Sequence, residues 1–405
     1  MFSSRTDWDF RTSPLYTIVQ ELRAEGKSIL DLTESNPTKC DLQFPADQLI
    51  PISALKDSVE YEPDPKGLIQ ARQAIAEWYG RQGVIVDPSR IVLTSGTSEA
   101  YSFLLKLLCN PEDAIAVPKP GYPLFEYLAR LHDVNCHQYR LAYDGEWHID
   151  PPSLEDAILG KTKAIVLIHP NNPTGSFVKI LERDSLLTTS RKCGIPLIVD
   201  EVFGSFGFAQ DVSRAGSFAG TQETLTFTVN GISKLIGLPQ LKLAWIVVSG
   251  PADLCSDALE RLEIISDTFL SVGTPVQHAL ASLLDDSDAT GNRIKERVRN
   301  NWIFLSTAFS SDLPASLFAC EGAWSAMFRL PATQSDEAWA KELLGSQHVL
   351  THPGRLFDCE LPACIVVSLL LPPAAFAEGI KRIISVIGSQ VPHSDPLFKS
   401  KTNPL

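Results

Sequence analysis

The chain has 405 residues, of which 44% are hydrophobic and 20% charged, and a formal net charge of −13 at pH 7. This length allows a large buried core and two domains, and the composition is that of an ordinary globular protein. The acidic balance argues against nucleic-acid binding, which needs clustered Lys and Arg. No uncharged apolar run of about 18 residues predicts a membrane span.

The eight cysteines are scattered, without a CxxC pair or metal-ligand spacing. Such cysteines are typical of buried thiols in a reducing compartment. The first residues, Met1 to Phe10, carry Arg5, Asp7 and Asp9 and no apolar stretch, so they do not resemble a signal peptide. We therefore expect a cytoplasmic protein without a metal site.

Helices and short apolar strands alternate from about Ser53 to Gly250. Runs such as Ile165–Ile168 and Leu197–Val199 are hydrophobic on both faces, which predicts a mainly parallel sheet covered by helices on both sides. We expect an α/β fold whose large domain has three layers and a mostly parallel seven-stranded sheet. The predicted strands are Arg90–Thr94, Ala114–Pro118, Cys136–Leu141, Lys163–His169, Leu197–Asp200, Thr224–Val229 and Leu243–Ser249. The predicted helices between them include Leu68–Tyr79 and Ser98–Leu108.

A second region begins near Asp285 with a long predicted helix, roughly Gly291–Phe309. Short strands around Ala323–Leu330 and Ile365–Leu370 and a helix near Ala374–Ile387 follow, which indicates a smaller α+β domain. The predicted division is an N-terminal segment packing with the small domain (1–45), a large domain (46–285), a small C-terminal domain (286–390) and a mobile tail (391–405).

Four segments with chemical potential each follow the end of a strand, where open α/β sheets bind ligands. The first is Thr94–Ala100, in which hydroxyls and a glycine turn the chain into a helix. Free N–H groups and the helix dipole make such a turn a natural phosphate site. The alternative is a helix N-cap without any ligand.

The second segment, Pro170–Gly175, follows the strand that ends at His169 and by itself is typical of a turn. The third is Asp200, which closes the apolar run Ile195–Val199. A carboxylate at the end of a buried strand is costly unless a cation or several donors meet it.

The fourth segment is Gly231–Pro239, which places Lys234 in an apolar loop flanked by glycines. Desolvation lowers the pKa of a lysine and suits it to Schiff-base chemistry. A lone lysine in a loop is otherwise only a solvated side chain.

The order and spacing of these segments resemble the class I/II aminotransferases, the aspartate aminotransferase-like group of fold-type-I pyridoxal-phosphate enzymes. Asn172 and Asp200 are 28 residues apart, and Asp200 and Lys234 are 34 apart, as is typical of that family. The resemblance extends from about Asp31 to Ile387 and is strongest between Tyr61 and Gly250. Each motif alone is weak, and the combination is specific.

The resemblance implies that Lys234 forms the Schiff base with pyridoxal 5′-phosphate and shuttles the proton at the substrate Cα. It implies that Asp200 faces the pyridine nitrogen and that Asn172 donates to the 3′ oxygen. It gives Tyr122 the role of the aromatic ring that stacks on the cofactor, with a simple loop aromatic as the alternative. It gives Tyr61 the role of a residue that reaches the phosphate of the neighbouring subunit, which implies a homodimer.

For the phosphate, the resemblance implies Ser95, Gly96 and Thr97. Lys242, eight residues after Lys234, stands where the family usually has an arginine. A lysine there keeps the charge and loses the bidentate fork.

The sequence departs from the family pattern in the cofactor site at two positions. Phe203 stands where the family commonly has a tyrosine whose hydroxyl binds the 3′ oxygen, so we expect a raised pKa of the Schiff base. Gly231 stands where the family usually has a serine, which removes a phosphate ligand.

A third departure concerns the substrate. Val366 falls where the family has the arginine that binds the substrate carboxylate, normally a bidentate clamp. Arg355 is the best nearby substitute, with an exposed surface arginine as the alternative. If no arginine takes over, the substrate does not present its carboxylate in the usual way.

The resemblance implies an aminotransferase acting on an amino acid and a 2-oxo acid. Because the carboxylate arginine is missing, a decarboxylase or carbon–sulfur lyase of the same fold remains an alternative. A third hypothesis is a non-catalytic regulator, although the sequence shows neither basic charge nor an added helix-turn-helix region.

Overall fold

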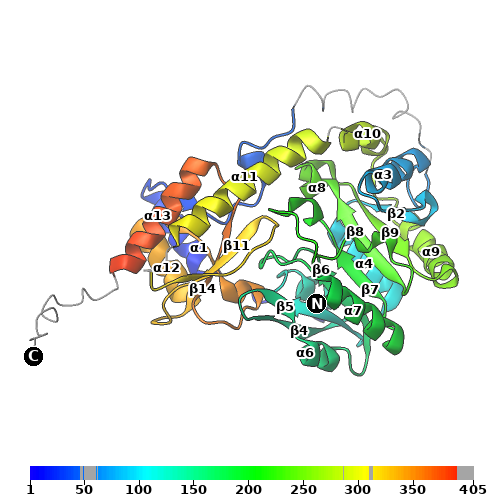
Figure 1. Ribbon diagram of the computed structural model, residues 1–405, viewed down its shortest axis with the longest axis horizontal. Helices are drawn as coiled ribbons and strands as arrows, with labels where there is room; N and C mark the ends of the chain where they lie inside the picture. Colours follow the sequence, from blue (N-terminus) through cyan, green and yellow to red (C-terminus); the bar gives the residue numbers. More distant parts are fainter. Residues whose placement is uncertain (46–48, 50–60, 62, 286, 310–312, 390–405) are drawn as a thin grey trace, which may run out of the picture.

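The computed structural model describes residues 1–45, 49, 61, 63–285, 287–309 and 313–389. The predicted tail, 391–405, and the predicted domain boundaries near 46, 286 and 390 lie outside these ranges. Figure 1 shows a large body built on one twisted sheet, a smaller body beside it, and the long helix α11 (Ser287–Ala308) running between them.

The large sheet has eight strands in the order β2-β9-β8-β7-β6-β3-β4-β5. Neighbours within β8-β7-β6-β3-β4 are parallel, whereas β2, β9 and β5 pair antiparallel with their neighbours. The α/β class is confirmed, and all seven predicted strands are present. The predicted count was one too low, because the three-residue strand β5 is too short to give a periodic signal. The strands are β2 (Ile91–Thr94), β3 (Ala114–Lys119), β4 (Asn135–Tyr143), β5 (Trp147–Ile149), β6 (Thr162–Ile168), β7 (Leu197–Asp200), β8 (Thr226–Gly231) and β9 (Ala244–Ser249).

Both faces of this sheet are buried, which explains the apolar runs. Along β9, Trp245 and Val247 pack into one hydrophobic cluster, and Ile246 and Val248 pack into another on the opposite face. Helices α4, α5 and α9 cover one face, and α3, α6, α7 and α10 cover the other. These helices are α3 (Ile69–Arg81), α4 (Thr97–Leu108), α5 (Phe125–Arg130), α6 (Pro151–Ala157), α7 (Ile180–Cys193), α9 (Ala252–Asp267) and α10 (Thr274–Asp285).

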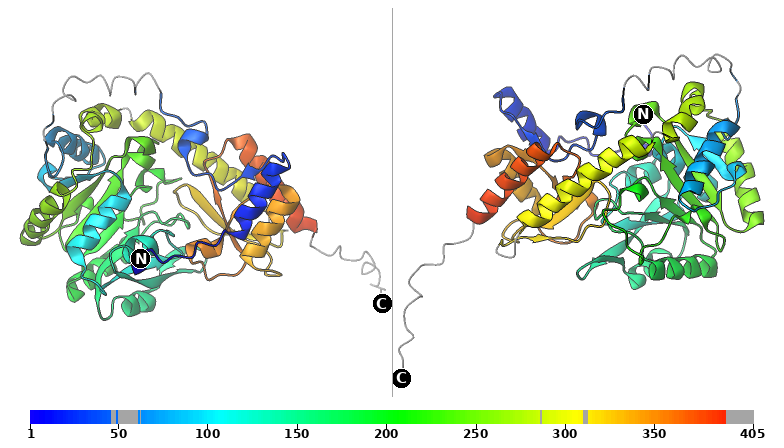
Figure 2. Two further views of the ribbon diagram at one scale, coloured as in Figure 1. Left: turned by 180° about the vertical axis from the view of Figure 1, so that it is seen from behind. Right: turned by 45° about the horizontal axis from the view of Figure 1, so that its top comes forward.

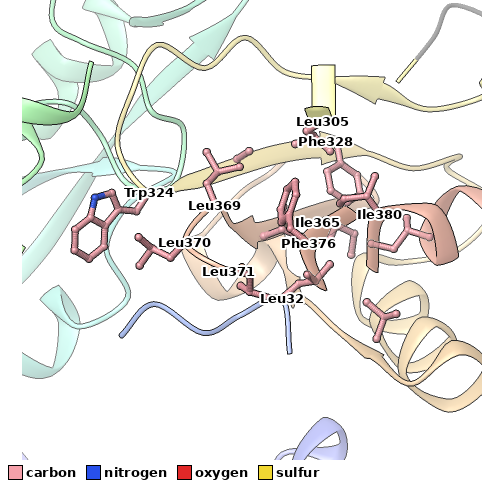
Figure 3. Close-up of a cluster of buried hydrophobic side chains, with 14 of the residues drawn as sticks. Leu32, Leu305, Trp324, Phe328, Ile365, Leu369, Leu370, Leu371, Phe376 and Ile380 are labelled. Atoms are coloured by element: carbon pink, nitrogen blue, oxygen red, sulfur yellow. The ribbon is translucent and has the colours of Figure 1, made fainter. Parts of the chain in front are cut away.

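The smaller body contains a four-stranded antiparallel sheet in the order β10-β11-β14-β13. Its strands are β10 (Ser316–Leu317), β11 (Ser325–Arg329), β13 (His352–Pro353) and β14 (Cys364–Ser368). Ile365 of β14 and Phe328 of β11 pack with Phe376 and Ile380 of α13 in the core that Figure 3 shows. The helices here are α11 (Ser287–Ala308), α12 (Asp336–Gln347) and α13 (Pro373–Ser389).

The N-terminal segment lies against this smaller body. Strand β1 (Leu30–Asp31) pairs in parallel with β12 (Val349–Leu350), and α1 (Pro14–Ala24) contacts α12. Figure 2 shows α1 beside the helices of the small sheet. Within the described ranges, no helix is both long and apolar enough to cross a membrane.

Candidate active site

Five segments with polar side chains meet at one edge of the large sheet. Strands β3, β6, β7 and β8 are parallel neighbours, and β2 runs in the same direction because it is antiparallel to β9, which is antiparallel to β8. The carboxyl ends of all five therefore lie at the same edge, where this class of sheet binds ligands.

A cavity of about 440 Å³ opens at this edge, between the large and the small sheet. It is lined by Thr97, Asn172, Asp200 and Lys234 from the four strand-end segments, and by Tyr122, which the family resemblance indicated. The structure therefore brings these five predicted residues together around one cavity.

Asp200 ends β7 and is buried. Its Oδ2 accepts a hydrogen bond from the Tyr101 hydroxyl at 3.2 Å, and its Oδ1 accepts one from the backbone N–H of Val202 at 3.1 Å. Burial raises the pKa of Asp200 to about 6, against the opposing effect of these two donors and of Lys234. A cation placed next to this carboxylate would favour its ionised form.

Lys234 lies in the short helix α8 (Ile232–Leu235), directly after β8. Burial lowers the pKa of its amine, and the nearby Asp200 opposes this shift. Its Nζ lies 5.1 Å from the centre of the Trp324 ring, which comes from the small-sheet side. Figure 3 shows Trp324 at one end of the small-sheet core, turned toward the large sheet. The lysine is therefore held between the two bodies in an apolar setting that favours its neutral, nucleophilic form.

The turn between β2 and α4 has the features of an anion site. No side chain caps the N-terminus of α4, where Gly96 takes the N-cap position. A methyl group placed on Gly96 would lie 3.4 Å from the Nζ of Lys242, so the lysine ammonium is close to this helix end. Uncapped N–H groups at a helix N-terminus together with an ammonium attract a phosphate.

Ser95, Gly96 and Lys242, at or near the turn between β2 and α4, are not among the residues that line this cavity, and neither are Tyr61 and Arg355. Tyr61 has 72% of its surface exposed. Arg355 has an exposed side chain that forms an ion pair with Glu337, and its backbone N–H donates to Asp336 at 2.7 Å. Arg355 does not line the cavity, because its guanidinium pairs with Glu337 of α12. Val366 itself lines the cavity.

The Gly231 departure has a steric cause. A Cβ at Gly231 would lie 2.7 Å from the Cβ of Ala244 on the paired strand β9. This distance is shorter than real Cβ contacts allow, so Ala244 occupies the space that a serine side chain would need. Phe203, the other departure, also lines the cavity and packs edge-on against Trp324.

Sequence reasoning missed several residues of the site. Tyr101 lies one helical turn after Thr97 in α4, so helical spacing could have linked it to the site. Ser233 directly precedes Lys234 and lines the cavity. Trp324 and His352 come from the small sheet, and no local pattern links them to Lys234.

The fold is shared with solved aminotransferases. An alanine aminotransferase from Pyrococcus furiosus has a TM-score of 0.88 to this chain, covering 96% of this chain and 100% of its own at 23% identity. The likeness shows a fold-type-I aminotransferase architecture.

Residues 29–383 match the family described as aminotransferase class I and II, and the chain belongs to that family. A glutamate-pyruvate aminotransferase AlaA of Haemophilus influenzae is 27% identical over 369 residues, 88% of this chain and 89% of its own. An alanine aminotransferase of Mycobacterium tuberculosis is 25% identical over 387 residues, 91% of this chain and 88% of its own. Enzymes of this family depend on pyridoxal phosphate, and the protein is a pyridoxal-phosphate-dependent aminotransferase.

The cavity fits that cofactor in three respects. Asp200 is a buried carboxylate that a protonated ring nitrogen would stabilise. Lys234 is a half-buried amine whose pKa is lowered by desolvation. The uncapped start of α4, next to Lys242, can receive a phosphate.

Proposed function

We propose that this enzyme moves an amino group between an amino acid and a 2-oxo acid, and that Lys234 is its catalytic lysine. The observation that carries the proposal is the presence of a half-buried amine, Lys234, and a buried carboxylate, Asp200, on the wall of one cavity. Pyridoxal phosphate, when bound, supplies a ring that takes up the electron pair released at the substrate Cα.

Each residue of the cofactor site then has a defined task. Lys234 would hold the cofactor through Nζ, and its amine is the base that would take the proton from the substrate Cα. Asp200 would keep the ring nitrogen protonated, and Asn172 would donate to the 3′ oxygen. Tyr122 would pack against the cofactor ring. Its location on the cavity wall supports this role.

The phosphate is assigned to the start of α4. The backbone N–H groups of Gly96 and Thr97 and the hydroxyl of Ser95 would hold it, and Lys242 would supply a positive charge. The proximity of Lys242 Nζ to Gly96 supports this assignment.

The proposal includes a homodimer in which Tyr61 reaches the active site of the neighbouring subunit. The exposed side chain of Tyr61, outside its own cavity, supports this arrangement. A cytoplasmic location is also proposed, since all eight cysteines are free thiols. Sedimentation equilibrium would test the dimer, and a monomer with full activity would contradict it.

The amino donor is best sought among amino acids with small or apolar side chains. The cavity lining includes the apolar side chains of Phe203, Leu356 and Val366, and no arginine lines the cavity among the described residues. Relatives named alanine and glutamate-pyruvate aminotransferases make alanine with 2-oxoglutarate and glutamate with pyruvate the first pairs to assay.

The test is a single-turnover reaction of the cofactor-loaded protein with one amino acid at a time. We expect the absorbance of the pyridoxal form to be replaced by that of the pyridoxamine form, with release of the matching 2-oxo acid. Release of carbon dioxide, or of pyruvate from a substrate with a β leaving group, without the pyridoxamine form would instead show a decarboxylase or a lyase.

A further inference from the structure

One face of the small sheet carries a row of three side chains, two of which line the active-site cavity. In the central strand β14, Val366 is paired directly with Met327 of β11 on one side and with His352 of β13 on the other. Directly paired residues of neighbouring strands project to the same face of a sheet. Val366 and His352 both line the cavity, so they form one stretch of its wall.

The same wall carries hydroxyl groups next to this row. Ser325 and Ser368 are paired with each other, two residues along the strands from Met327 and Val366, and therefore lie on the same face. Both line the cavity. His352 thus lies in a wall that is otherwise apolar or neutral.

The charges that line the cavity are few. Among the lining residues that the structure describes, the basic side chains are Lys234 and His352, and the acidic one is Asp200. Lys234 serves the cofactor and the reacting carbon in the proposed function. Every amino acid and 2-oxo acid brings an α-carboxylate, and a carboxylate taken from water into a partly apolar cavity needs a donor or a cation.

His352 is free to act as that partner. Its ring packs edge-on against Phe357, with 5.8 Å between ring centres. Neither ring nitrogen makes a hydrogen bond within the part of the chain that the structure describes. Burial lowers the pKa of His352 and Asp31 opposes this shift, so the ring receives an anion as a neutral donor that can take up a proton.

We propose that His352 binds the α-carboxylate of the substrate, in the wall where Val366 cannot. This inference rests on the proposed function and extends it, because it assigns the group that recognises amino acids and 2-oxo acids in this enzyme. An imidazole makes one directed hydrogen bond where an arginine makes two, so the enzyme holds this carboxylate through a single main contact.

The experiment compares substrates with and without the carboxylate. The cofactor-loaded wild type and His352→Ala are titrated in single turnover with an amino acid, and separately with the amine that has the same side chain and no carboxylate. We expect His352→Ala to weaken the apparent affinity for the amino acid at least tenfold and to change that for the amine less than twofold. An equal loss for both ligands, or no loss for the amino acid, would overturn the proposal.

A second substitution tests the position of the contact. In His352→Ala/Val366→Arg, a guanidinium enters the same row of the wall, and we expect most of the lost amino-acid affinity to return. His278→Ala, on α10 and outside the cavity lining, is the matched control and should leave both affinities unchanged. If the single variant folds poorly, His352→Gln keeps a neutral donor and should give an intermediate affinity.

The same experiments distinguish a failure of the His352 contact from a failure of the proposed aminotransferase reaction. If the wild type forms no pyridoxamine with any amino acid, the proposed function fails. If the wild type reacts and His352→Ala reacts with the same affinities, the function stands and only the carboxylate contact is wrong.

Discussion

The hydroxyl of Tyr101, in α4, donates a 3.2 Å hydrogen bond to Oδ2 of Asp200, at the end of β7. Both side chains are buried, so this contact stabilises the carboxylate away from water. It opposes the burial that raises the pKa of Asp200. The helix that begins at the proposed phosphate site therefore also supports the group assigned to the ring nitrogen.

Tyr101→Phe should weaken cofactor binding without abolishing it. Loss of a donor to a buried carboxylate costs about 1.5–3 kcal/mol, or roughly 10-fold to 150-fold in affinity. Equilibrium titration of the cofactor-free protein with pyridoxal phosphate measures the change. Tyr79→Phe removes another buried hydroxyl, hydrogen-bonded to Trp245, and should leave the affinity intact. Equal losses in the two variants would contradict a specific role of Tyr101.

Asp200→Asn should stabilise the cofactor-free protein at high pH. Burial raises the pKa of Asp200 from 3.8 to about 6. The folded state thus binds this proton more tightly than the unfolded state, and the stability that this carboxyl contributes is lost as the pH rises from about 4 through 6. At pH 8 the neutral amide avoids a penalty on the order of 2–3 kcal/mol, at roughly 1.4 kcal/mol per pKa unit.

Urea denaturation at pH 4 and at pH 8 measures that effect, which should be large only at pH 8. Asp211→Asn is the control of opposite sign, because hydrogen bonds from Ser213 lower the pKa of Asp211. The same Asp200→Asn variant should bind pyridoxal phosphate more weakly. A gain in stability that is equal at both pH values would refute the ionisation argument.

Lys234→Ala should abolish the covalent attachment of the cofactor. Treatment with borohydride fixes a Schiff base as a stable secondary amine, so the wild type should gain the mass of the reduced cofactor and the variant should not. Lys242→Ala serves as the comparison, since it removes a phosphate contact and should weaken binding while the covalent attachment remains. If Lys234→Ala still gains the mass, another lysine carries the cofactor.

Gly231→Ser should destabilise the protein instead of restoring a phosphate ligand. The new Cβ would lie 2.7 Å from that of Ala244, and such overpacking costs about 1–3 kcal/mol. The double variant Gly231→Ser/Ala244→Gly opens the space and should recover much of the lost stability. Thermal unfolding of the two single variants and the double variant gives the coupling between the positions. Strict additivity of the two effects would show that they do not clash.

The strand-end segments show how much of the site could be predicted. Asp200 ends one predicted strand and Lys234 closely follows another. Because parallel strands end at one edge of a sheet, the sequence alone predicts that these two residues lie near each other. Arg355 shows where such a prediction fails. Arg355 is near Val366 in sequence, but its guanidinium forms an ion pair with Glu337 of α12 and does not line the cavity.

The order of apolar strands and amphipathic helices therefore determined the α/β class and the large-sheet half of the site, because buried strands and their ends are marked locally by composition. The small-sheet half was decided only by the tertiary structure. Antiparallel pairing of β13 with β14 sets His352 beside Val366. The packing of the two bodies brings the centre of the Trp324 ring to 5.1 Å from the Nζ of Lys234. Such contacts join residues far apart in the chain, and neither hydrophobic periodicity nor motif spacing carries information about them.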